Sequence, residues 1–243
     1  MALQSSGAIK LSEIQTEFGG SDPISLSEYY QNADPDLVTE NNTGIPDTGN
    51  PISMSDFYDA VLAKTVVYEV IGGGGEGAGG YYNTGNGNAG TDSSLASASG
   101  TSFTTVTSTG GVGGTQPAPF DGNFRTGEAG EASYYGSGGN GGINSDSNNQ
   151  TAGFPAPSTS YGAGGGGGGA YPFAANNGGG GGKAATRQTG TLYLAPSSTI
   201  TVTIGSGGTG NAGGGDGAGG YAKFTVGNDV QTFTSSGTYT VPS

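Results

Sequence analysis

Thr65-Val66-Val67-Tyr68-Glu69-Val70-Ile71-Gly72-Gly73-Gly74-Gly75 is a strand pattern that runs directly into a glycine tract. Residues 65–71 are mostly β-branched or aromatic, which is typical of a pleated, half-buried strand. Turn residues at 196–198, 227–229 and 235–237 separate several similar stretches. These further expected strands are 101–107, 189–195, 199–204, 221–226, 231–234 and 238–241. The sequence therefore predicts an all-β, glycine-rich domain of antiparallel strands over residues 65–243.

Glycine occupies 54 of the 243 positions and gathers in tracts at 72–75, 164–169, 178–182 and 213–215. A single tract fits a flexible linker equally well, but several tracts that adjoin strands or aromatic residues favour order. The ordered form is a polyglycine helix of the polyproline-II type, which has three residues per turn and no internal hydrogen bonds. Its backbone groups must be paired with neighbours or water. We therefore expect the tracts to fold together as a bundle or to stay loose together.

Residues 1–64 contain a short motif three times, as Ile9-Lys10-Leu11-Ser12-Glu13-Ile14, Ile24-Ser25-Leu26-Ser27-Glu28-Tyr29 and Ile52-Ser53-Met54-Ser55-Asp56-Phe57. A serine that accepts from free N–H groups and an acidic residue near the positive end of a helix are typical of a helix start. The pairs Ser12 and Gln15, Ser25 and Glu28, and Ser53 and Asp56 have the spacing of a capping box. The motif predicts short helices over residues 12–18, 27–32 and 55–63.

The apolar positions of these repeats form a stripe. Helices this short bury too little surface to fold alone, so we expect the stripe to pack against the chain's own β domain or against another subunit. Residues 1–64 are thus predicted to be an attachment region. The expected docking residues are Leu11, Ile14, Leu26, Tyr29, Met54 and Phe57.

Composition argues against an enzyme. The chain has no histidine and no cysteine, which removes catalytic triads, thiolate chemistry and the usual zinc sites. Residues 182–184, Gly-Lys-Ala, place alanine where a phosphate-binding loop needs a hydroxyl. The carboxylates of Glu128 and Glu131 lie in a glycine-rich stretch that is poor at fixing a catalytic pair. We therefore expect no catalytic, cofactor-binding or metal-binding residues.

Charge and hydropathy exclude two classes of partner. The net charge is −13 and the six cationic residues are isolated from one another, so the basic face that nucleic acid requires is missing. No apolar run approaches the roughly 20 residues of a membrane helix. The sequence predicts no nucleic-acid binding and no membrane insertion.

Aromatic residues in the loops are the better candidates for surface recognition. Tyrosine stacks on sugars or apolar groups and donates a hydrogen bond at small entropic cost. The competing interpretation is that these rings fill the core, since glycine supplies no side chains for it. The candidates are Tyr81, Tyr82, Phe120, Phe124, Tyr134, Tyr135, Phe154, Tyr161, Tyr171 and Phe173.

Two resemblances follow from these patterns. Residues 3–20, with their echo at 26–30, look like a module found near the ends of structural proteins of marine and cyanobacterial phages. Residues 231–242, 67–75 and 198–208 resemble the glycine-rich domain of phage tail and tail-fibre proteins. In that family a hairpin like 231–242 precedes the strand that enters the glycine turn, whereas here it closes the chain. This order implies circular permutation, with the strand around Tyr239 beside the strand around Val67.

The resemblance implies a virion structural protein, made in the host cytoplasm and incorporated in the phage particle. The favoured role is a tail-fibre or adhesin component that docks on other virion proteins through its N-terminal repeats. Its glycine-rich and aromatic loops would contact a host surface glycan or outer-membrane protein. The alternative is a capsid decoration or cement protein bound to the outer shell. The usual symmetry of fibres implies a homo-oligomer, with a trimer as the first expectation.

Overall fold

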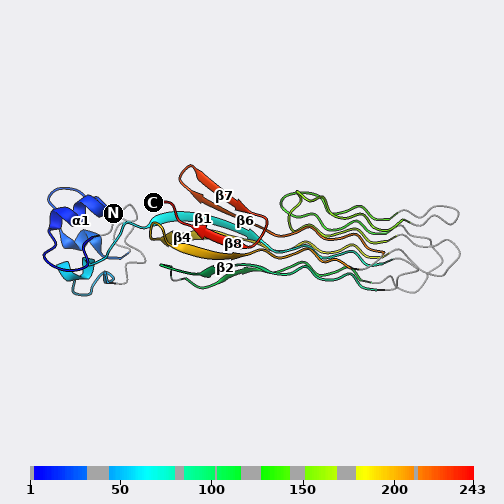
Figure 1. Cartoon of the computed structure of the whole chain (residues 1–243), viewed down its shortest axis with the longest axis horizontal. Coiled ribbons are helices and arrows are strands. Elements are labelled where there is room, and N and C mark those ends of the chain that lie inside the picture. The colour runs from blue at the N-terminus through cyan, green and yellow to red at the C-terminus, as the bar shows by residue number, and fades with distance from the viewer. Residues whose placement is uncertain are drawn as a thin grey trace.

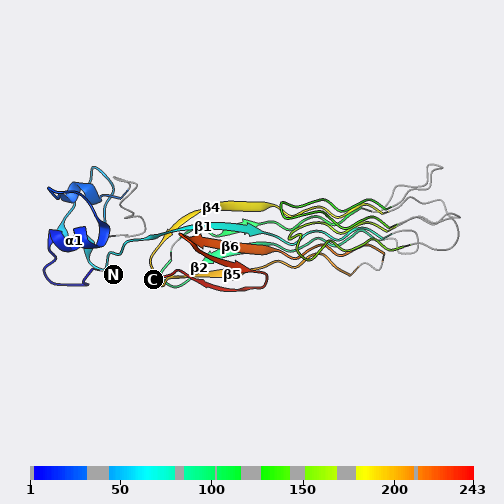
Figure 2. The same ribbon diagram turned by 90° about the horizontal axis from the view of Figure 1, so that it is seen from above.

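The computed structural model describes residues 3–31, 44–79, 85–101, 103–115, 127–142, 151–168, 179–210 and 213–243. These residues form a long molecule with three parts in line (Figures 1 and 2). An N-terminal module of short helices is followed by a β-sandwich, whose strands continue into an extended bundle of glycine-rich chain. No helix among the described residues is long and apolar enough to cross a membrane.

The sandwich consists of two antiparallel sheets, which confirms the all-β expectation. The described residues contain eight strands, in the orders β4-β1-β6-β7 and β3-β2-β5-β8. The first sheet contains β1 (Lys64–Ile71), β4 (Arg187–Leu194), β6 (Tyr221–Val226) and β7 (Asp229–Phe233). The second contains β2 (Ser93–Ser97), β3 (Val106–Ser108), β5 (Thr199–Thr203) and β8 (Gly237–Thr240).

The sandwich core lies between the two sheets and follows the alternation of the strands. Val66 and Val70 of β1 face inward and are fully buried, while Val67 between them is 49% exposed on the outer face. The Phe224 ring of β6 stacks on the Tyr239 ring of β8, with centroids 4.1 Å apart. This contact joins the two sheets.

Most expected strands are confirmed within one or two residues, but the second sheet departs from the prediction. The expected strand at 101–107 is reduced to β3, and β2 was not expected at all. The sequence of β2 is Ser-Ser-Leu-Ala-Ser, in which Leu95 is the one large apolar residue. Its place is set by pairing with β5 rather than by its own pattern.

The expected C-terminal hairpin is wrong. Strand β7 pairs with β6, while β8 crosses to the other sheet and pairs with β5, so that Tyr239 lies opposite Ile200. The strand around Val67 has β4 and β6 as its neighbours, so the pairing with Tyr239 inferred from circular permutation is also wrong. The physical reason is Phe224, since Phe233 packs on its ring from the same sheet and Tyr239 stacks on it from the facing sheet.

The glycine tracts form an ordered bundle, here called the glycine array. Six of its segments continue strands β1 to β6 of the sandwich, and four more complete it within the described residues. The ten segments are 72–79, 85–91, 110–115, 127–132, 138–142, 153–156, 162–168, 179–185, 205–210 and 213–220.

Segment 72–79 shows the three-residue period of a polyglycine helix. Its N–H groups point to three antiparallel neighbours in turn, so that every third residue donates to the same one. Residues 73, 76 and 79 donate to segment 85–91, residues 74 and 77 to segment 213–220, and residues 75 and 78 to segment 179–185. Its carbonyl groups accept from three parallel neighbours, the segments 110–115, 162–168 and 205–210. The segment therefore has six neighbours.

Segment 162–168 is a second centre of the same kind. It bonds to segments 72–79, 127–132, 138–142, 153–156, 179–185 and 213–220. Each central segment is thus surrounded by six neighbours, as in a hexagonal packing. The two sets of neighbours share segments 179–185 and 213–220. Both central segments are buried throughout their described length. A Cβ atom added to Gly74 would stand less than 3.0 Å from the carbonyl oxygen of Ala163, so this packing requires glycine.

The N-terminal module contains one α-helix, α1 (Leu11–Phe18), and two 3-10 turns, η1 (Leu26–Tyr29) and η2 (Met54–Phe57). The second and third helices are therefore shorter than expected. In each repeat the acidic side chain accepts from the backbone N–H three residues before it. The pairs are Glu13 with Lys10 at 2.7 Å, Glu28 with Ser25 at 3.1 Å and Asp56 with Ser53 at 2.7 Å. The expected Ser12 cap is wrong, since Lys10 is the residue that precedes α1.

Candidate functional site

The expected docking residues form the core of the N-terminal module itself. Ile14, Tyr29 and Phe57, which hold the same position in the three repeats, are each 0% exposed and belong to one cluster. The rings of Tyr29 and Phe57 meet edge to face at 6.0 Å. The remaining members, Leu11, Leu26 and Met54, are partly buried against this cluster.

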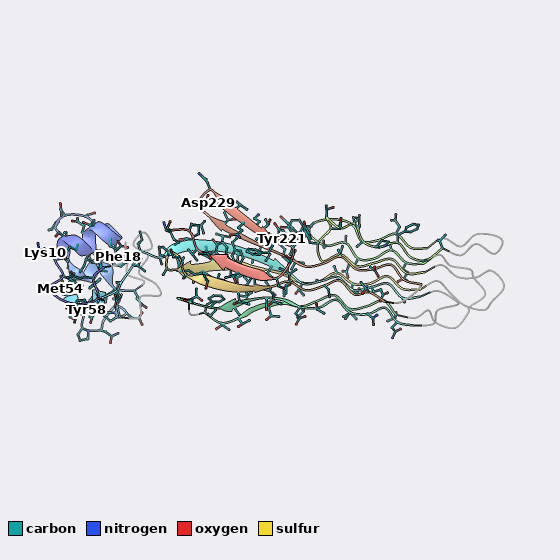
Figure 3. All side chains as sticks on the ribbon, viewed as in Figure 1. Lys10, Phe18, Met54, Tyr58, Tyr221 and Asp229 are labelled. Atoms are coloured by element: carbon teal, nitrogen blue, oxygen red, sulfur yellow. The ribbon has the colours of Figure 1, made fainter. Side chains whose placement is uncertain are left out.

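All members of this cluster lie within residues 3–62, so the buried part of the stripe packs within the module and not on the β domain. Contact of the stripe with a partner stays a prediction. The three repeats together bury an apolar surface that one short helix could not bury alone. The three fully buried side chains are out of reach of a partner, so docking through this module would use its exposed surface. Tyr58, which is 37% exposed, lies on that surface (Figure 3).

Four expected recognition residues lie within the described part of the chain. Tyr134 is 69% exposed and Phe154 is 48% exposed, whereas Tyr135 and Tyr161 are half-buried. The other six, Tyr81, Tyr82, Phe120, Phe124, Tyr171 and Phe173, lie outside the described residues.

Tyr135 and Tyr161 join Tyr221 in a tyrosine cluster where the sandwich meets the array. The Tyr161 and Tyr221 rings stack at 4.6 Å, and the Tyr135 ring stands edge-on to Tyr221 at 5.0 Å. Figure 3 shows Tyr221 at this junction. Sequence reasoning missed the role of Tyr221 because it begins a strand. These rings pack two turns of the array, 133–137 and 157–161, onto β6, so for Tyr135 and Tyr161 the core-filling interpretation is the better one.

A buried ion pair supports the tyrosine cluster. Glu69 of β1 is buried and its carboxylate accepts from Nε of Arg187 on β4. Burial, followed by hydrogen bonding and repulsion from the Glu69 carboxylate, raises the pKa of Tyr135, so its hydroxyl stays protonated. The guanidinium of Arg187 also lies 3.9 Å from the centre of the Tyr134 ring. Tyr134 is thus held in place although it is exposed.

The other candidate site is the end of the array away from the sandwich, here called the far end. The N–H of Gly79 bonds to Gly85, and that of Gly179 bonds to Gly168. Likewise the N–H of Gly127 bonds to Gly142. The chain leaves the described region here at 80–84, 116–126, 143–150, 169–178 and 211–212. An array segment precedes and follows each of these five stretches, directly or, after 143–150, from residue 153 on.

A buried carboxylate stabilises the array near this end. Glu76 is fully buried in the central segment 72–79, and one oxygen accepts from the backbone N–H and from Nδ2 of Asn88, both at 3.0 Å. Nδ2 of Asn88 also donates to the carbonyl of Thr209 at 2.7 Å. Three segments are joined in this way. Glu76 was not among the candidate residues, because nothing in its local sequence distinguishes it from an exposed acid.

No group of His, Cys, Asp and Glu that could hold a metal ion occurs among the described residues. No family model, curated protein sequence or solved structure matches the chain.

Proposed function

We propose that the chain is a structural adhesin of a phage particle. It attaches to other virion proteins through the N-terminal module, and it presents host-binding segments at the far end of the glycine array. The virion assignment comes from the sequence resemblance of residues 3–20 and of the strand-to-glycine pattern. The adhesin assignment comes from the shape of the molecule.

The observation that carries the proposal is that five connecting segments begin and end at one end of a hydrogen-bonded bundle. Binding residues are often placed on loops that a rigid scaffold positions. Fixing the flanks of a loop lowers the entropy that is lost when it binds. The N-terminal module lies at the opposite end of the molecule (Figure 1), which separates attachment from recognition.

Six of the ten aromatic recognition candidates belong to the connecting segments 80–84, 116–126 and 169–178. Asn and Gly accompany them, as in other binding surfaces that combine aromatic contacts with adaptable polar groups. A host glycan or outer-membrane protein is the partner that this composition supports best.

The test replaces residues 80–84 and 169–178 with Gly-Ser segments of equal length. Labelled protein is incubated with a panel of cyanobacterial strains, and bound protein is measured together with the melting temperature. We expect the variant to lose binding at an unchanged melting temperature, since the replaced residues are not among the ten segments that define the array. The matched control is Asn228→Ser at the β6–β7 turn, which should bind like the parent. Equal binding by the loop variant and the parent would contradict the proposal.

Copy number separates this role from capsid decoration, the alternative that the sequence left open. An adhesin is present in tens of copies per particle, and a decoration protein in hundreds. Quantitative mass spectrometry of purified particles gives this number directly.

A further inference from the structure

The outer face of the first sheet carries an open groove of about 370 Å³ beside the tyrosine cluster. It lies over β4, β1 and β6, on the side turned away from the sandwich core. Its lining side chains are Val67, Glu69, Arg187, Thr189, Lys223 and Thr225. In the strand register Glu69 stands between Thr189 on β4 and Lys223 on β6.

The charge of this groove is opposite to that of the chain. The protein has six cationic residues and a net charge of −13, yet two of the six cations line this one groove. Arg187 is paired with Glu69 through Nε, and its terminal nitrogens have no hydrogen-bond partner among the described residues. Lys223 makes no ion pair within the same part of the chain. With Glu69 counted, the groove holds one positive charge in excess.

The remaining groups suit a polar ring-shaped ligand. Thr189 and Thr225 offer hydroxyl groups, and Val67 offers an exposed apolar surface. The exposed Tyr134 ring stands next to the groove, held by its contact with Arg187. Tyrosine beside hydroxyl and cationic groups is a common combination for binding a sugar.

A peptide fits this place less well. Strand β1 has a hydrogen-bonded neighbour on each side, so the groove lies in the interior of the sheet. Strand addition to β1 is therefore blocked, and an extended peptide here could pair only along the outer edge of β4, to the side of the groove's centre.

We propose that this groove binds an acidic saccharide through the carboxylate of a sugar ring. The terminal nitrogens of Arg187 and the ammonium group of Lys223 hold the carboxylate, because charge-assisted hydrogen bonds of this kind are strong and directional. The threonine hydroxyls bond to the ring hydroxyls, and the sugar lies against Val67 and Tyr134. This site is separate from the far end of the array, and its existence does not depend on the adhesin role.

The probe is a short oligomer of galacturonic acid, and its methyl ester is the uncharged counterpart. Binding is followed by NMR titration of the whole chain, with the Lys223 and Thr225 amide signals as the readout of position. We expect the acid to shift these signals, and the methyl ester to bind at least about tenfold more weakly. Equal binding of acid and ester, or shifts confined to other parts of the chain, would overturn the proposal.

Two variants complete the test. Lys223→Gln should weaken binding of the acid about tenfold or more, since one charge-assisted bond is lost. Lys183→Gln removes an exposed charge on the array, outside the groove, and should leave affinity unchanged. If both variants behave alike, the attraction is non-specific and the proposal is wrong. Host-cell binding by Lys223→Gln is measured in parallel, and its retention shows that this groove and the far end act independently.

Discussion

At the scale of the residue, Gly74 illustrates what the array demands. It lies in the central segment 72–79, and a Cβ atom there would collide with the backbone carbonyl of Ala163. Neither backbone can give way, because both are held by hydrogen bonds to other segments. We expect Gly74→Ala to lower the free energy of unfolding by about 3 kcal/mol or more, measured by urea denaturation.

Gly219 supplies the matched control. It lies in segment 213–220, and an added Cβ would meet no atom within 4 Å. Gly219→Ala should change stability by less than about 1 kcal/mol, and in the stabilising direction if the loss of unfolded-state entropy dominates. Similar losses from both alanine variants would contradict the packing described for Gly74.

Buried tyrosines make stability depend on alkaline pH. Burial, with added repulsion from nearby carboxylates, raises the pKa of Tyr29, Tyr135, Tyr221 and Tyr239 above the ordinary value of 10.0. The unfolded chain ionises these groups first, so their contribution to stability is complete below about pH 10 and is lost as pH rises through the folded pKa values.

We therefore expect the free energy of unfolding to fall above about pH 10, and to fall less steeply in Tyr135→Phe. Phenolate absorbance and near-ultraviolet circular dichroism, recorded together, check this. The account fails if all 13 tyrosines ionise while the circular dichroism of the fold stays intact.

At the scale of the element, the start of α1 distinguishes the observed cap from the one that the sequence predicted. Glu13 accepts from the Lys10 N–H, whereas the side chain of Ser12 does not cap the helix. We expect Glu13→Ala to destabilise the N-terminal module by about 1 kcal/mol and Ser12→Ala to leave it nearly unchanged. Amide exchange within α1 measures both effects. A larger loss from Ser12→Ala than from Glu13→Ala would restore the sequence-based cap.

The elements that sequence predicted correctly are those with a local pattern. Strand β1 has a run of β-branched and aromatic residues, and the glycine tracts adjoin strands and take the polyglycine-helix form that was expected for an ordered state. Strand β2 could not be predicted because a single large side chain, Leu95, anchors it. The crossing of β8 to the second sheet depends on the stacking of Tyr239 on Phe224. Phe224 lies in the other sheet, so this contact can be identified only in the assembled core.

The array segments that lack long glycine runs were also missed, although a pattern was present. Glu128 and Glu131 are three residues apart and both exposed, and their N–H groups donate to Gly179 and Gly182 of one neighbour. A polyglycine helix has three residues per turn, so side chains three positions apart lie on the same face. Two exposed acids with this spacing therefore fit the outer face of such a helix. The same two residues were first considered as a catalytic pair, and their spacing instead marks segment 127–132.

For the candidate sites, the sequence indicated which types of residue matter better than it indicated where they lie and what they contact. Sequence reasoning chose Tyr134, Tyr135 and Tyr161 as loop aromatics, but not the role of Glu69 and Arg187 in fixing them. It grouped the apolar residues of the N-terminal repeats correctly, but expected them to pack on the β domain or on another subunit, whereas Ile14, Tyr29 and Phe57 are buried within the module. In both cases contacts between residues distant in sequence decide the outcome, and a local pattern does not show them.

In the whole molecule, the segments of the array are expected to order and unfold cooperatively. Glycine loses more conformational freedom on ordering than any other residue, and a polyglycine helix gains no bonds within itself. Order therefore depends on neighbours that are remote in sequence, such as segments 72–79 and 162–168. The order of the described array, up to its far end, follows from this mutual bonding.

Amide hydrogen exchange, resolved by residue with NMR, shows whether the array is held by these bonds. The N–H groups of residues 73–79 all have carbonyl partners, whereas those of Asp216 and Gly219 have none among the described residues. The account predicts that residues 73–79 exchange as slowly as β1, while Asp216 and Gly219 exchange fast. Fast exchange throughout residues 73–79 would contradict it.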